Sequence, residues 1–132
     1  MKACVIDTSA LIAMVLGEPE ASVFARKLVE YDCVWVCSAT VLEARLVVWG
    51  RKGEAGIQVL AQLLERPMFA TAAPSMVETD IAYDAAKRYG KGNGHPAQLN
   101  FGDLFSYATA KSRGLPLLYK GNDFLQTDVE MA

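Results

Sequence analysis

Four acidic residues stand where strand-like segments of the chain give way to helix-like ones. Asp7 and Asp123 come soon after apolar runs, and Glu43 and Asp103 lie in the first turns of helix-like segments. Singly, each carboxylate fits a helix cap or a first-turn acid, and Glu43 also fits a capping box with Thr40. If all four carboxylates lay at one edge of a sheet, they would repel one another and raise one another's pKa values unless a cation neutralised their charges. Because an all-carboxylate set suits Mg²⁺ or Mn²⁺, the pattern predicts metal-dependent phosphodiester hydrolysis.

The segments that must bring these acids together alternate between strand and helix. Apolar, β-branched runs predict strands at 3–6, 34–37, 68–71 and 117–119. Periodicity and glycine stops predict helices at 9–16, 19–30, 38–49, 54–66, 75–89 and 102–113. The stretch 90–100 is irregular, and Val129 is expected in a short edge strand. We therefore expect an α/β three-layer fold: one domain over 1–132, with a mostly parallel sheet of four or five strands flanked by helices. In such a sheet, ligands bind beyond the carboxyl ends of the strands, where the four acids are expected.

Composition narrows the class of protein. The 132 residues are 52% apolar and 21% charged, with a net charge of −2, which excludes a disordered chain and a strongly basic nucleic-acid binder. Asp7 interrupts the apolar N-terminal run, so neither a signal peptide nor a membrane span is expected. The odd number of cysteines, Cys4, Cys33 and Cys37, favours reduced thiols and a cytoplasmic location. A zinc site is disfavoured because the lone histidine, His95, completes no second ligand pair.

Four blocks of the sequence resemble the signature blocks of PIN domains, and most closely those of the VapC-type toxins. The blocks are VIDTSALIA at 5–13, the helix that contains Glu43, NFGDLFSYA at 100–108 and LLYKGNDF at 117–124. This resemblance spans nearly the whole chain. It implies a PIN fold and Mg²⁺- or Mn²⁺-dependent cleavage of RNA that leaves a 5′-phosphate and a 3′-hydroxyl. It also implies a homodimer, and inhibition by a VapB-type antitoxin in a type II toxin–antitoxin pair.

The resemblance also assigns roles to residues of this chain. It implies that the four acids of the first paragraph form the metal-binding and catalytic quartet, with Asp7 and Asp103 as the firmest ligands. Ser9 matches a hydroxyl that arranges the first acid. Asp128 matches a further acid seen in many relatives, although capping or solvation of the last turn explains it equally well.

Candidates for binding the RNA are fewer, since most basic side chains fit solvated helix faces. Lys91 in the glycine-rich stretch and Lys120 near Asp123 are the better candidates for backbone contacts, and Arg45 fits either the RNA groove or an antitoxin carboxylate. His95 has no predicted partner, and metal-dependent hydrolysis does not require it as a general acid.

Three other functions fit parts of the pattern. A phosphorelay receiver needs adjacent acids after the first strand, and a haloacid-dehalogenase-type phosphatase needs Asp-x-Asp. Both are excluded because Asp7 is followed by Thr8 and Ser9. The third is a catalytically silent PIN module that acts only through protein binding. A missing acid would favour this module, and none of the four is missing.

Overall fold

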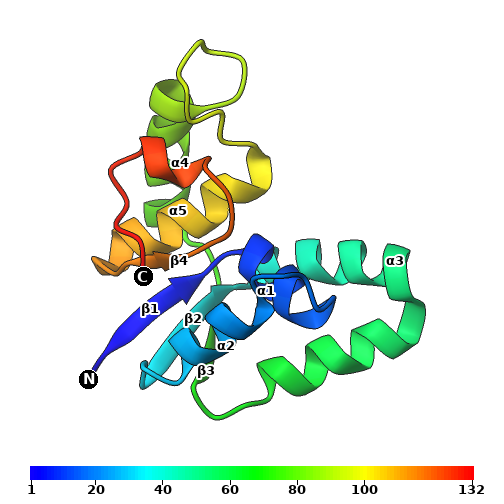
Figure 1. Ribbon diagram of the computed structural model, residues 1–132. Helices are drawn as coiled ribbons and strands as arrows, with labels where there is room; N and C mark the ends of the chain where they lie inside the picture. The colour runs from blue at the N-terminus through cyan, green and yellow to red at the C-terminus, as the bar shows by residue number, and fades with distance from the viewer.

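Four parallel strands form the centre of the computed structural model, which describes all of residues 1–132 (Figure 1). They are β1 (Ala3–Ile6), β2 (Cys33–Cys37), β3 (Phe69–Ala72) and β4 (Leu117–Leu118), in the spatial order β3-β2-β1-β4. The central strand β1 pairs in parallel with β2 on one side and β4 on the other. The parallel sheet expected from the sequence is thereby confirmed.

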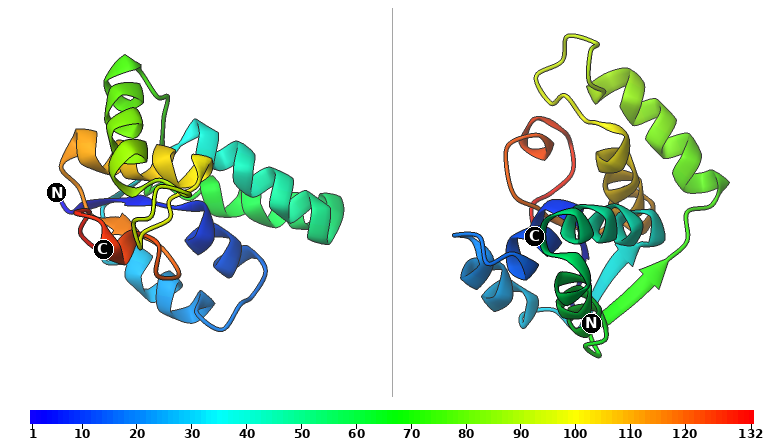
Figure 2. Two further views of the ribbon diagram at one scale, coloured as in Figure 1. Left: turned by 90° about the horizontal axis from the view of Figure 1, so that it is seen from above. Right: turned by 90° about the vertical axis from the view of Figure 1, so that its right-hand side faces the viewer.

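Helices cover both faces of this sheet because β1 and β2 are apolar on both sides. Cys4 and Ile6 point into a core shared with α1 (Thr8–Val15), α2 (Ala21–Leu28) and both arms of α3 (Ser38–Leu64). Val5 points the other way, into a second core. That core is covered by α4 and α5, which span Met76–Tyr89 and Phe101–Arg113. Figure 2 shows α4 and α5 on one side of the sheet and α1 and α2 on the other, which gives the expected three layers.

The two helices that the sequence predicts at 38–49 and 54–66 are the two arms of α3, which spans Ser38–Leu64. They meet at Gly53, whose φ of 59° and ψ of −154° are far from helical values. This backbone conformation favours glycine, which lacks the Cβ that would clash there. The result is a sharp kink, and α3 leaves the sheet and returns toward it as two arms (Figure 1).

The helix predicted at 19–30 begins two residues later, at Ala21. Gly17 takes a left-handed φ of 67°, which ends the preceding helix, and Pro19 and Glu20 then form a turn closed by a hydrogen bond from the Ala21 N–H to the Glu18 carbonyl. The proline therefore occupies a turn rather than a first helical position. The other element boundaries differ from those predicted by one or two residues, which is ordinary at element ends.

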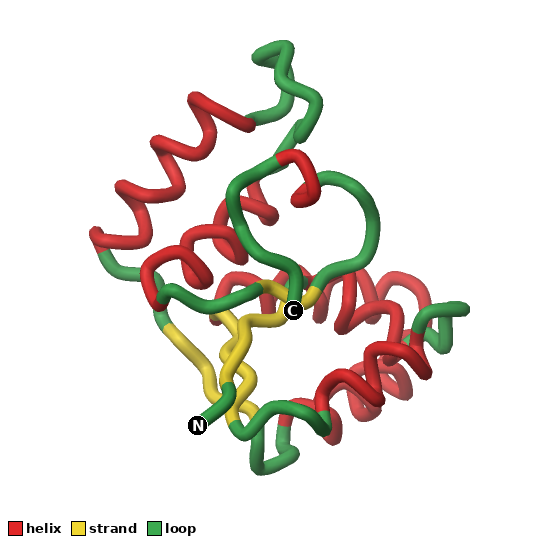
Figure 3. Tube along the Cα trace, turned by 60° about the vertical axis from the view of Figure 1, so that its left-hand side comes forward, coloured by secondary structure: helices red, strands yellow, loops and turns green.

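Figure 3 shows two long irregular segments: the 90–100 stretch, at the top of the view, and the C-terminal segment, which ends beside the sheet. The 90–100 stretch is irregular as predicted and is closed by a single bridge between Gly90 and Leu99. The expected edge strand is reduced to one bridge, between Leu117 and Met131. Val129, where that strand was expected, is instead buried in the second core. None of the helices combines the length and the apolar character needed to cross a membrane.

Candidate active site

Asp7 is the most deeply buried of the four acids, with 3% of its surface exposed. It leaves the end of β1 and caps α1, where its Oδ2 accepts hydrogen bonds from the Ser9 N–H at 3.0 Å and the Ser9 hydroxyl at 2.7 Å. The fully buried Ser106 hydroxyl of α5 donates to Asp7 Oδ1 at 2.5 Å. The Thr40 hydroxyl lies 3.4 Å from that of Ser106 and extends the network to α3.

These hydrogen bonds fix the orientation of the Asp7 carboxylate. Each carboxylate oxygen has two lone-pair positions. Oδ2 uses both on Ser9, whereas Oδ1 uses one on Ser106 and keeps one. One acceptor position of a buried, fixed carboxylate therefore remains for a ligand.

Glu43 faces the same region from the first turns of α3. Its Oε1 accepts a 2.5 Å hydrogen bond from the Thr8 hydroxyl, on the residue after Asp7. Its carboxylate rests against Gly102 at the start of α5, where any Cβ would overlap it. The capping box with Thr40 does not form, because α3 begins at Ser38 and its cap residue, Cys37, makes no side-chain hydrogen bond.

Asp103 combines a capping role with a position among the other acids. It forms a capping box with Asn100, whose N–H donates to Asp103 Oδ2 at 3.0 Å. Burial raises the pKa of Asp103 to about 7 against the lowering effect of that hydrogen bond, and the negative charges of Asp7, Asp123 and Glu43 add to the rise. The other three acids therefore lie within electrostatic reach of Asp103.

Asp123 is the exposed member of the set. It stands just before the short 3₁₀ helix η1 (Phe124–Gln126) and makes no capping hydrogen bond there. Its loop is anchored by the buried rings of Tyr119 and Phe124, whose centroids are 5.0 Å apart. The side chain of Asp123 is therefore available to a ligand.

The donor set fits a hard divalent cation. All four side chains offer carboxylate oxygens, and a cation would relieve the repulsion that contributes to the raised pKa of Asp103. No three acidic, cysteine or histidine side chains lie close enough to form a finished ion-binding cluster. Asp7 and Asp103 would hold the ion, with Glu43 and Asp123 completing the site directly or through water.

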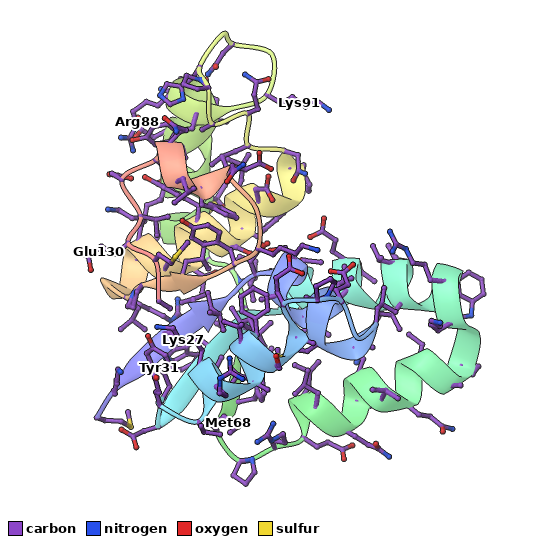
Figure 4. The ribbon with its side chains drawn as sticks, in the orientation of Figure 1. Lys27, Tyr31, Met68, Arg88, Lys91 and Glu130 are labelled. Carbon is purple, nitrogen blue, oxygen red and sulfur yellow. The ribbon has the colours of Figure 1, made fainter.

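Asp128 does not join this site. Tyr107 donates a 2.5 Å hydrogen bond to Asp128 Oδ1, and Oδ2 lies 3.3 Å from Lys111 Nζ and 3.9 Å from an Arg88 nitrogen. Arg88 lies on α4, and Tyr107 and Lys111 lie on α5. Figure 4 labels Arg88 and the exposed Glu130 of the C-terminal segment, which passes along this side of the two helices. In this structure Asp128 ties that segment down.

The three basic candidates have different surroundings. Lys120 Nζ lies 3.0 Å from Glu18 Oε1 and 3.3 Å from Glu20 Oε2, and these hydrogen bonds raise the pKa of Lys120. Lys91 and Arg45 are exposed and make no ion pair. In Figure 4, Lys91 extends outward from the loop at the top of the molecule, on the side that faces the start of α5.

His95 has a structural explanation. Its Nδ1 accepts a 3.0 Å hydrogen bond from the Ala97 N–H, and its ring packs edge-on against Tyr89 at a centroid distance of 5.0 Å. It therefore belongs to the fold of the 90–100 loop.

Three residues that shape the site were not predicted from the sequence. Thr8 and Ser106 orient Glu43 and Asp7, and Gly102 makes room for Glu43. Gly102 carried one signal, since glycine in a helical first turn is unfavourable without a packing reason. The two hydroxyl residues carried none, because their partners are distant in sequence.

Comparison with known proteins agrees with this fold and site. The sequence model of the PIN domain matches residues 4–130. The chain is 46% identical over 126 residues to ribonuclease VapC30 of Mycobacterium tuberculosis, covering 95% of both chains. It is 43% identical over 125 residues to a ribonuclease VapC of Mycolicibacterium smegmatis, covering 95% of this chain and 96% of that one.

Two crystal structures share the fold at low sequence identity. Mycobacterium tuberculosis VapC20, described as a sarcin-ricin loop cleaving toxin, superposes with a TM-score of 0.80 at 15% identity over 98% of each chain. VapBC2 from Rickettsia felis, bound to a DNA fragment from its promoter, gives 0.72 at 12% identity over 98% of this chain and 96% of that one. Together with the sequence matches, these likenesses show that the chain belongs to the PIN-domain family. Its sequence relatives within that family are VapC ribonucleases.

Proposed function

We propose that this protein is a metal-dependent endoribonuclease and the toxin of a type II toxin–antitoxin pair. Its relatives named ribonuclease VapC match it over 95% of the chain. The observation that carries the proposal is the convergence of Asp7, Glu43 and Asp123 on Asp103, whose pKa their charges help to raise. Such a set would hold a hard cation at the carboxyl ends of β1, β2 and β4, the edge at which parallel α/β sheets bind ligands.

Mg²⁺ or Mn²⁺ would supply the activation of water and the neutralisation of charge on the attacked phosphate. The contribution of the chain itself is to orient the acidic side chains. Ser9 and Ser106 fix the Asp7 carboxylate with one acceptor position free. Thr8 holds Glu43 across from it, and the capping box with Asn100 fixes Asp103 at the start of α5. We expect products that carry a 5′-phosphate and a 3′-hydroxyl.

We propose Lys91 and Arg45 as contacts to the RNA backbone. Both are exposed and neither is engaged in an ion pair. Contacts of this kind position the nucleic acid and weaken with salt, so each contact removed should flatten the salt dependence of RNA binding.

We propose a homodimer formed through an apolar face beside Glu43. Leu42, Leu46 and Trp49 on α3 are 57%, 60% and 60% exposed, and Phe101 on α5 is 76% exposed. Leu42, Leu46 and Phe101 line a groove of about 470 Å³ that reaches Glu43. A patch of large apolar side chains of this kind marks an interaction surface.

Light scattering tests the dimer. The wild-type chain should be a dimer, and Leu46→Glu should make it a monomer. The matched change Val59→Glu, at a 47% exposed position on the other arm of the same helix, should leave it dimeric. A monomeric wild type, or a dimer that persists in Leu46→Glu, would reject this surface.

The second protein partner is a VapB-type antitoxin, which we expect to be encoded directly upstream. Its product should co-purify with this chain and suppress RNA cleavage. Because RNA and such a partner share the cytoplasm, we place the protein there. We treat residues 1–132 as a single PIN domain, since the PIN model matches residues 4–130.

Cleavage of purified bacterial total RNA tests the activity. EDTA-treated protein should be inactive and should regain activity with Mg²⁺ or Mn²⁺, and adapters that require a 5′-phosphate should ligate to the products. Unchanged cleavage in EDTA would contradict the metal dependence. The absence of cleavage with either ion would instead favour a catalytically silent module that acts by protein binding.

A further inference from the structure

Lys120 contacts the N-terminal part of the chain through both its backbone and its side chain. Its backbone N–H donates a 2.9 Å hydrogen bond to the Ser9 hydroxyl, the same hydroxyl that donates to Asp7. Its ammonium lies 3.0 Å from Glu18 and 3.3 Å from Glu20, in the connection between α1 and α2. These contacts join the exit of β4 to segments about a hundred residues earlier in the chain.

The loop held in this way carries Asp123. Lys120 and Asp123 are separated by Gly121 and Asn122, and Gly121 takes a left-handed φ of 97°. The exposed Asp123 makes no capping hydrogen bond of its own, so the contacts at the start of its loop and the buried Phe124 at the end determine its position.

The carboxylates around Lys120 indicate that it is committed to this position. Glu20 uses Oε2 on Lys120, while its Oε1 is buried without any hydrogen-bond partner. A buried carboxylate oxygen without a partner is unfavourable. Withdrawing the ammonium would also leave the Glu20 carboxylate, whose side chain is 39% exposed, without its counterion. If Lys120 moved to an RNA phosphate, the new contact would therefore have to compensate for the loss of its contacts with both carboxylates.

We infer that Lys120 is a positioning residue, which holds the Asp123 loop against the α1–α2 connection through Glu18 and Glu20 instead of binding the RNA backbone. The inference rests on the proposed ribonuclease activity, since Asp123 acts in that site. Removing the ammonium or its carboxylate partners releases the same loop and has the same consequence for catalysis.

Three variants separate positioning from phosphate binding: Lys120→Met, Glu18→Gln/Glu20→Gln, and the triple variant that combines them. With purified bacterial total RNA as the probe, the first two should each lower kcat about tenfold with little change in KM, as expected when the support of a ligand is lost. The triple variant should be no slower than either, because all three remove one shared interaction. If Lys120 bound phosphate, Lys120→Met would raise KM and Glu18→Gln/Glu20→Gln would leave KM unchanged or lower it. That pattern, or an unchanged kcat in Lys120→Met, overturns the inference.

Charge inversion adds a rescue. Lys120→Glu should be at least as impaired as Lys120→Met, and adding Glu18→Lys with Glu20→Gln should restore part of its kcat. A phosphate contact would not be restored in this way, so the absence of rescue counts against positioning.

Two further measurements do not depend on activity. Hydrogen exchange of the peptide that covers residues 119–124 should be faster in Lys120→Met and in Glu18→Gln/Glu20→Gln than in the wild type, and unchanged exchange would contradict the inference even if the RNA proved to be the wrong substrate. Urea unfolding confirms that each variant is folded. Lys27→Met with Glu30→Gln is the matched control, because it removes the surface ion pairs of Glu30 with Lys27 and Lys2 near the opposite end of the sheet, where Figure 4 labels Lys27. If the wild type itself cleaves no RNA, the proposed function fails and the exchange measurement still decides this inference.

Discussion

The Ser106 hydroxyl donates a 2.5 Å hydrogen bond to Asp7 Oδ1, which joins two buried residues that lie 99 positions apart in the sequence. Ser106 lies on α5, about one turn after Asp103, and Asp7 directly follows β1. The bond thus connects the two segments that carry the firmest candidate metal ligands. Any movement of α5 against the sheet would disturb both acids together.

Replacing Ser106 with alanine should therefore weaken the site more than the fold. Asp7 Oδ1 and the Thr40 hydroxyl lose their partner, which should lower the free energy of unfolding by about 1 kcal/mol. RNA cleavage should fall about tenfold, the typical effect of losing a residue that orients a metal ligand. Ser112→Ala is the control, since that hydroxyl bonds a carbonyl at the far end of the same helix. Equal cleavage by the two variants would show that Ser106 does not orient the site.

Gly102→Ala should disable the site through Glu43. The new methyl group would overlap the Glu43 carboxylate and force it from its place beside Thr8. Cleavage should drop by about tenfold or more while urea unfolding stays cooperative. Gly50→Ala is the matched control in α3, because a Cβ there meets nothing within 4 Å. It should leave cleavage unchanged and raise helix stability slightly, and a similar loss in both variants would refute the steric explanation.

Asp128→Ala should lower stability without affecting the chemistry. It removes an acceptor from the fully buried Tyr107 and the ion pairs with Lys111 and Arg88. We expect the free energy of unfolding to fall by about 1–3 kcal/mol, measured by urea titration, with kcat on RNA unchanged. Glu130→Ala, at an exposed neighbouring position, should do neither. A large loss of kcat in Asp128→Ala, with the fold intact, would return Asp128 to the catalytic set.

The start of α4 should show its own pH dependence. Hydrogen bonds from the backbone and hydroxyl of Ser75 lower the pKa of Glu78 to about 2 from its ordinary 4.5. Because the folded-state pKa is depressed, the stabilisation is present above about pH 4.5 and is lost as the pH falls toward 2. At neutral pH, Glu78→Gln should be less stable than the wild type by under about 1 kcal/mol, since the group is exposed. The gap in free energy of unfolding should close between pH 5 and pH 2, and a gap independent of pH would contradict this.

How much the sequence could predict depended on whether a residue's partners are local. Asp7 was recognisable because it follows a buried strand, and Asp103 because it opens a helix, and both positions are properties of short segments. Lys120 looked like a phosphate contact because its carboxylate partners lie about a hundred residues away and come together only when β4 pairs beside β1. The break in α3 was predicted after residue 49 because Gly50 is a local helix-stop signal, whereas the kink itself lies three residues later, at Gly53.

The most direct test of the account replaces single carboxylates with amides of nearly the same shape. Asp7→Asn and Asp103→Asn keep most of the hydrogen bonds to Ser9, Ser106 and Asn100 but remove the charges that would hold the cation. Mg²⁺-dependent cleavage of bacterial total RNA should fall by more than about a hundredfold in each variant, while Asp80→Asn, on the exposed surface of α4, cleaves like the wild type. Folded Asp7→Asn or Asp103→Asn protein that cleaves at the wild-type rate would contradict the assignment of this site.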